Sequence, residues 1–157
     1  MSWPEGFSPP PDAHRHPIVV EEGDVDELGH VNNVRWVRFV IDAAVSHSSA
    51  LGLDLAAYLA LGVVWVVRQQ QIDYLRPARL GERLTIVTWV HSVALSSSVR
   101  RTVVVREHDR RPLLTATTTW VMVDRAGRPT PVPGSVRERF AAGASRPPAS
   151  APDAPTP

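Results

Sequence analysis

The sequence predicts an α+β fold with an antiparallel sheet, because one helical segment is followed by four strand-like runs. These runs, rich in Val, Thr, Ile and Trp, are residues 63–75, 84–93, 99–107 and 113–123. Turn signals separate them at Arg76-Pro77, near Asp109-Arg110, and the last run ends before Ala126-Gly127. A helix ahead of a series of strands favours a sheet with the helix packed against one face.

A short strand starting at Ile18 is predicted to open the domain, and a helix follows it. Five apolar residues recur at helical spacing, namely Val34, Val37, Ile41, Ala44 and Val45. Trp36, Phe39 and Val40 widen this apolar stripe, whereas Arg35, Arg38, Asp42 and Ser46 form a narrow polar stripe. We therefore expect the helix to be buried over most of its surface, with the first stripe at its centre.

The length of 157 residues suits one domain. We expect this domain to span residues 17–140. The flanking segments 1–16 and 141–157 are rich in proline and poor in large apolar residues, so they are predicted to be flexible tails.

Composition excludes several classes of function. The formal net charge is +1, so no basic surface for nucleic acid is expected. There is no cysteine, which excludes disulfides, thiolate nucleophiles and cysteine metal sites. No apolar run is long enough to span a bilayer. The first 16 residues lack the apolar core of a secretory signal, so a cytoplasmic location is the expectation.

The candidate site is the acidic stretch at residues 24–33, Asp-Val-Asp-Glu-Leu-Gly-His-Val-Asn-Asn, just before the predicted helix. A helix N-terminus presents unpaired N–H groups and a partial positive charge. A carboxylate base beside such donors is what acyl transfer requires. The residues alone also allow a structural interpretation, in which Asn32 or Asn33 caps the helix and Gly29 serves only the turn.

This stretch resembles the signature of the hotdog-fold thioesterases, in the branch of 4-hydroxybenzoyl-CoA thioesterase and bacterial acyl-CoA thioesterases. Residues 72–82, with Leu75-Arg76-Pro77-Ala78, resemble the second landmark of that family. Residues 121–129 resemble its last strand and turn. The resemblance covers about residues 17–140. It implies an antiparallel sheet wrapped around one long helix, and a homodimer or a homotetramer made of two dimers.

The resemblance also implies roles for four residues of the acidic stretch. Asp26 matches the aspartate that acts as general base or as nucleophile. Asn33, seven positions later, matches the residue whose backbone N–H polarises the thioester carbonyl. Gly29 would let the backbone approach the acyl group closely. His30 matches a catalytic histidine of plant-type acyl carrier protein thioesterases, but Leu28 stands where those enzymes have asparagine, so His30 is either a water-orienting residue or a structural histidine.

Arginines are candidates for binding the phosphates of coenzyme A, because a guanidinium binds phosphate through two hydrogen bonds. Arg76, Arg100 and Arg101 are the candidates. Neither a metal nor a cofactor is expected.

The prediction is an acyl-CoA thioesterase, with an acyl carrier protein thioesterase, a hotdog dehydratase or a non-catalytic acyl-thioester-binding module as alternatives. The expected partners are the acyl-CoA or acyl carrier protein substrate and further copies of the chain.

Overall fold

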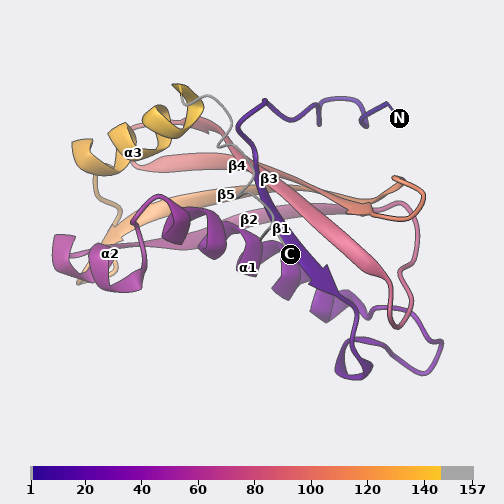
Figure 1. Cartoon of the computed structure of the whole chain (residues 1–157). Coiled ribbons are helices and arrows are strands. Elements are labelled where there is room, and N and C mark those ends of the chain that lie inside the picture. Colours follow the sequence, from indigo (N-terminus) through magenta and orange to yellow (C-terminus); the bar gives the residue numbers. More distant parts are fainter. Residues whose placement is uncertain (1, 146–157) are drawn as a thin grey trace, which may run out of the picture.

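The computed structural model describes residues 2–145 and has the predicted α+β architecture (Figure 1). Five antiparallel strands form one sheet in the order β1-β3-β4-β5-β2. The strands are β1 (His14–Val19), β2 (Val63–Tyr74), β3 (Arg83–Val93), β4 (Ser97–Arg106) and β5 (Pro112–Asp124). The helices are the 3-10 turn η1 (Glu22–Asp24), α1 (Asn33–Ala50), α2 (Leu55–Leu61) and α3 (Gly134–Ser145).

The four predicted long strands are confirmed as β2 to β5, with ends within two residues of the expected ones. Their β-branched residues alternate between the two faces of the sheet. Leu84, Ile86 and Val104 belong to the core under α1. Val87 and Val103 belong to a separate cluster on the opposite face. Both faces of the central strands are therefore buried.

Helix α1 runs along one face of the sheet (Figure 1), but the stripe at its buried centre is not the predicted one. The buried residues are Trp36, Phe39, Val40, Ala43, Ala44 and Ser48. Val34 and Val45, which were expected inside, are 75% and 57% exposed. The helix is apolar on two sides, and the side with the large aromatic rings packs on the sheet because it removes more apolar area from water. A second apolar stripe is left at the surface of the single chain.

Helix and strand structure extends beyond residues 17–140 at both ends. Strand β1 begins at His14, inside the segment expected to be a flexible tail. Trp3 and Phe7 of that segment pack against the cluster that contains Trp89. At the other end α3 continues to Ser145, past the expected boundary at residue 140. The remainder of the expected C-terminal tail, residues 146–157, lies outside the described residues.

Helices α2 and α3 were not predicted, and they lie at the end of the sheet where α1 finishes (Figure 1). They enclose a second core cluster with the start of β2 and the end of β5, formed by Leu53, Tyr58, Val63, Met122, Val132 and Val136. Among residues 2–145 no helix is long and apolar enough to cross a membrane. The two ends of α1 are therefore different: its C-terminal end is enclosed, and its N-terminal end carries the acidic turn.

Candidate active site

The acidic turn, defined here as residues 24–31, is a tight loop closed by its own backbone. Val25 and Val31 form an antiparallel bridge across its base. The Asp26 N–H donates to the His30 carbonyl at 2.9 Å, and the Gly29 N–H donates to the Asp26 carbonyl at 2.9 Å. Gly29 has φ +78°, a conformation that favours glycine, and a Cβ there would meet nothing within 4 Å. The glycine is therefore required by the turn itself.

The Asp26 carboxylate is exposed at the tip of the acidic turn. Its Oδ1 accepts the Leu28 N–H at 2.9 Å, which fixes the side chain against its own loop. Among the described residues, no ion pair involves this carboxylate. Oδ2 is free to accept a proton from water or to attack an electrophile.

Asp24, two residues earlier, has the opposite environment. It is 4% exposed, and its Oδ1 accepts from Arg35 Nε at 2.7 Å and lies 2.6 Å from Nη2. Its Oδ2 accepts the Glu21 N–H, and its carbonyl accepts the Asn32 N–H at 2.9 Å. Asp24 thus fastens the acidic turn to the first turn of α1. The sequence did not indicate this ion pair, because the partners are eleven positions apart and several acids compete for the same role.

The start of α1 resolves the question of which asparagine is the cap. The Asn32 Oδ1 accepts the N–H groups of Val34 and Arg35 at 2.9 and 3.2 Å. Asn33 is the first helical residue, so its N–H has no acceptor within the helix. The Asn33 side chain is exposed. Asn32 is the helix cap, and Asn33 has the open backbone donor that the predicted role requires.

A second turn, between β2 and β3, lies against the acidic turn. His30 forms an isolated bridge with Arg79, and the Val31 N–H donates to the Ala78 carbonyl at 2.9 Å. The two stretches that resemble family landmarks are therefore adjacent in space. The His30 ring is half-buried, and the part of the chain that the structure describes gives it no hydrogen-bond partner.

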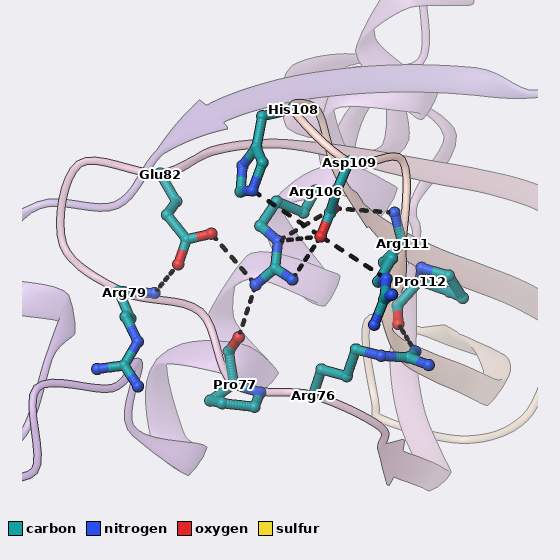
Figure 2. A network of polar contacts seen from close by, with 9 residues as sticks. All are labelled: Arg76, Pro77, Arg79, Glu82, Arg106, His108, Asp109, Arg111 and Pro112. Carbon is teal, nitrogen blue, oxygen red and sulfur yellow. Dashed lines mark hydrogen bonds and ion pairs between the residues drawn. The ribbon is translucent and has the colours of Figure 1, made fainter.

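Arg106 connects this second turn with the β4–β5 hairpin, as Figure 2 shows. Its guanidinium donates to the Pro77 carbonyl at 3.3 Å and lies 3.3 Å from the Glu82 carboxylate. It also contacts Asp109 at 2.7 Å, and this bond holds the pKa of Asp109 well below its usual range. Glu82 in turn accepts the Arg79 N–H at 2.7 Å. The tip of the β4–β5 hairpin is thus tied to the turn that borders the acidic turn.

The three candidate arginines lie in different places. Arg76 is exposed beside the second turn, where its Nη1 donates to the Pro112 carbonyl (Figure 2). Arg101 donates to the Gly6 carbonyl on the sheet face away from α1. Arg100 is 4% exposed and donates to His47 Nδ1 and Thr88 Oγ1, so its guanidinium does not lie at the surface of the single chain beside the other two. It also lies six residues along β4 from Arg106, which corresponds to roughly 20 Å.

Comparison with known proteins identifies the family. Residues 20–140 match the model of the Thioesterase-like superfamily. The chain belongs to this superfamily. The predicted hotdog fold is confirmed by solved structures of thioesterases, which superpose on most of the chain.

Three proteins to which the chain is similar are informative. Acyl-acyl carrier protein thioesterase ATL2 of Arabidopsis thaliana is 24% identical over 127 residues, covering 81% of this chain and 68% of its own. A Thermus thermophilus thioesterase crystallised with coenzyme A and Zn is 26% identical, with a TM-score of 0.74 over 91% of this chain and 99% of its own. Staphylococcus aureus SAV2348, in complex with CoA, is 15% identical, with a TM-score of 0.81 over 94% of each chain.

The candidate site of this thioesterase-like protein therefore contains an exposed carboxylate, a helix N–H and an imidazole at one end of α1, and residues 2–145 supply no hydrogen-bond acceptor to that N–H and no partner to that ring. Such a set can activate water and stabilise an oxyanion. The site is open in the single chain, since Leu28 at its tip is 77% exposed. Among residues 2–145 no three acidic, histidine or cysteine side chains converge as metal ligands.

Proposed function

We propose that this protein is an acyl-CoA thioesterase with Asp26 as its reactive carboxylate. As general base, Asp26 takes a proton from water while the water oxygen bonds to the thioester carbonyl carbon. The carbonyl oxygen becomes an oxyanion, which the Asn33 N–H stabilises. Collapse of this intermediate breaks the C–S bond, and the departing thiolate takes the proton from Asp26. As nucleophile, Asp26 instead bonds to the carbonyl carbon, expels the thiolate and forms an anhydride, which water then cleaves.

One observation carries this proposal: the acidic turn places an exposed carboxylate next to a helix start whose first N–H is open. The Asp24–Arg35 ion pair and the Asn32 cap hold this arrangement without using either reactive group.

Coenzyme A as the carrier is supported by two relatives whose structures contain it. Arg76 is exposed close to the second turn and is the better candidate for a phosphate contact. Arg101 lies on the opposite face of the sheet, and its binding of a phosphate remains a prediction. The cytoplasmic location also stays a prediction.

A homodimer is part of the proposal, since the single chain leaves two apolar surfaces uncovered. Strand β2 is an edge strand of 12 residues, with Val66 and Val67 about two-fifths exposed (41% and 43%). Long edge strands with apolar side chains are usually paired or covered in native proteins. The exposed stripe of α1, with Val34 and Val45, gives a second surface for a partner. A tetramer would need a further interface.

The test is release of free thiol from a panel of acyl-CoA esters, comparing the natural protein with Asp26→Asn. The variant keeps an Oδ1 that can accept the Leu28 N–H, so the turn is retained while the base is lost. We expect turnover to fall about 10²–10⁴-fold, as for removal of a general base. The chain has no cysteine, so the thiol-reactive dye records only released coenzyme A.

Glu27→Gln is the matched control, because Glu27 is an exposed acid in the same turn. It should leave turnover nearly unchanged. Unchanged turnover in Asp26→Asn would refute the mechanism. Binding without hydrolysis in the natural protein would favour the acyl-binding module, and release of water from a hydroxyacyl ester without free thiol would favour the dehydratase.

An acyl carrier protein thioesterase is the second candidate, supported by the similarity to ATL2 over 81% of the chain. The His30 ring without a partner fits this alternative, whereas Leu28 departs from the expected asparagine. Parallel assays with one acyl group on coenzyme A and on a carrier protein decide between the two, through the ratio of kcat/KM.

A further inference from the structure

A cavity of about 160 Å³ lies at the enclosed end of α1, between that helix, α2, α3 and the sheet. We call it the α1-end cavity. Its lining is mostly apolar and aromatic, and includes Ala44, Val64, Trp65, Val93, Trp120 and Phe140. Apolar cavities of about 150 Å³ are known to admit a benzene molecule. The α1-end cavity therefore has room for an apolar group of about six to eight carbon atoms.

One buried cation, Arg100, forms part of this lining. Its Nη1 donates to His47 Nδ1 at 2.9 Å and to Thr88 Oγ1 at 3.2 Å. Thr88 is neutral, and His47 is neutral as well because burial, Arg100 and His14 lower its pKa to about 3. Within residues 2–145, neither Nε nor Nη2 of Arg100 has an acceptor. Two parallel donors of the guanidinium are thus unused.

No carboxylate compensates this charge among the described residues. Asp54, the acid on the lining, is exposed, and its Oδ1 caps α2 by accepting the Ala57 N–H. Arg137, the second lining arginine, donates to the carbonyls of Ala94 and Leu95. Burying a cation without a counter-ion is costly, so an anion in the cavity would be strongly stabilised.

We propose that the α1-end cavity is a binding site for a small amphiphilic carboxylate, with Nε and Nη2 of Arg100 binding its two oxygens. The side-on edge of a guanidinium matches a carboxylate through two parallel hydrogen bonds. An apolar body of six to eight carbons fills the rest of the cavity. A singly charged carboxylate suits this site better than a phosphate, whose greater charge is more costly to remove from water.

The proposed site is separate from the hydrolytic site. His47 lies fourteen residues along α1 from Asn33, which corresponds to about 21 Å. The ligand is thus bound without contact with Asp26, and the inference does not depend on hydrolytic activity.

Binding can be measured on the full chain by tryptophan fluorescence, because Trp65 and Trp120 line the cavity. The probes are octanoate, with a linear body, and 3-phenylpropanoate, with an aromatic one. Each is compared with the alcohol of the same skeleton. We expect at least one acid to bind about tenfold or more tightly than its alcohol, since only the acid pairs with Arg100. The acid with the higher affinity shows whether a linear or an aromatic body fits the cavity better.

Arg100→Met should abolish this preference for the acid. Arg101→Met is the matched control, because Arg101 is the next residue on β4 and its guanidinium lies on the opposite face of the sheet. It should leave the preference unchanged, as should Asp26→Asn. If Arg100→Met does not fold, Val93→Phe provides a second test, since it fills a partly exposed position of the lining and should block the acid.

Three results would overturn the proposal. The first is equal affinity for acid and alcohol in the natural protein. The second is no binding of any probe, which would mean that the cavity holds water only. The third is an acid preference that persists in Arg100→Met or is lost in Asp26→Asn, which would place the ligand elsewhere.

Discussion

Two aspartates only two positions apart have opposite environments in the acidic turn. Asp24 is buried and paired with Arg35, whereas Asp26 is exposed and forms no ion pair with any residue of the described part of the chain. The resemblance pointed to Asp26 as the proposed reactive acid, but the sequence did not indicate that Asp24 is the anchoring acid. Both are aspartates in the same local pattern, and only the path of the chain decides which one meets the Arg35 guanidinium.

His47 makes stability depend on pH. Burial, followed by the charges of Arg100 and His14, lowers its pKa from 6.5 to about 3. Between these values the unfolded chain binds a proton that the folded chain does not, so stability falls as the pH decreases from about 6.5 to 3. His47→Asn keeps an acceptor for Arg100 and removes the titration. We expect its Tm to fall less than that of the natural protein between pH 7 and pH 4.

Thermal unfolding followed by circular dichroism at several pH values measures this difference. His108→Asn is a suitable comparison, since His108 is exposed at the β4–β5 turn. Parallel pH curves for the natural protein and His47→Asn would show that His47 is not the group responsible.

At the scale of the elements, the first turn of α1 combines a cap with an open donor. The Asn32 side chain accepts the N–H groups of Val34 and Arg35, and the Asn33 N–H remains available. This division can be tested because proline is well tolerated at the first position of a helix. Asn32 has φ −77° and ψ 153°, a conformation compatible with a following proline.

Asn33→Pro should therefore remove the proposed oxyanion donor and leave the helix intact. We expect kcat to fall about 10²–10³-fold, the usual cost of one such donor. Asn33→Ala, which keeps the N–H and loses only an exposed side chain, should retain activity. Steady-state kinetics with a matched measurement of Tm checks both. Equal loss in the two variants would assign the effect to the side chain.

The elements show what sequence patterns can and cannot predict here. Strands β2 to β5 were predicted because runs of β-branched residues between turn signals strongly favour strands. Helix α1 was predicted, but not its buried face, because apolar residues cover two of its sides. Helix α2 was missed, since its seven residues, LAAYLAL, lack the polar face that marks a helix. The burial of Arg100 was not predicted, because nothing local distinguishes an inward-facing arginine from an outward-facing one.

At the scale of the whole molecule, the proposed dimer gives the clearest prediction. Val66→Lys places a charge on the edge strand β2, and the second copy would repeat it across the interface. We expect the natural protein to have twice the mass of one chain in light scattering, or four times for a tetramer. The variant should be monomeric and inactive.

Val19→Lys is the control, because Val19 is 47% exposed on β1, the opposite edge of the sheet. It should keep both assembly and activity. A dimeric Val66→Lys variant would exclude pairing through β2, and an active monomer would show that one chain suffices for hydrolysis.

Arg106 has a consequence for motion as well as for structure. It connects the tip of the β4–β5 hairpin, through Asp109, with Pro77 and Glu82 of the turn that receives the Val31 N–H. We therefore expect opening of the acidic turn to be coupled to loosening of this junction. We expect the amide protons of Asp26 and Val31 to exchange with solvent together with those around Asp109, in one cooperative event. The lifetime of the closed acidic turn would then depend on an ion pair outside the proposed reactive groups Asp26, His30 and the Asn33 N–H.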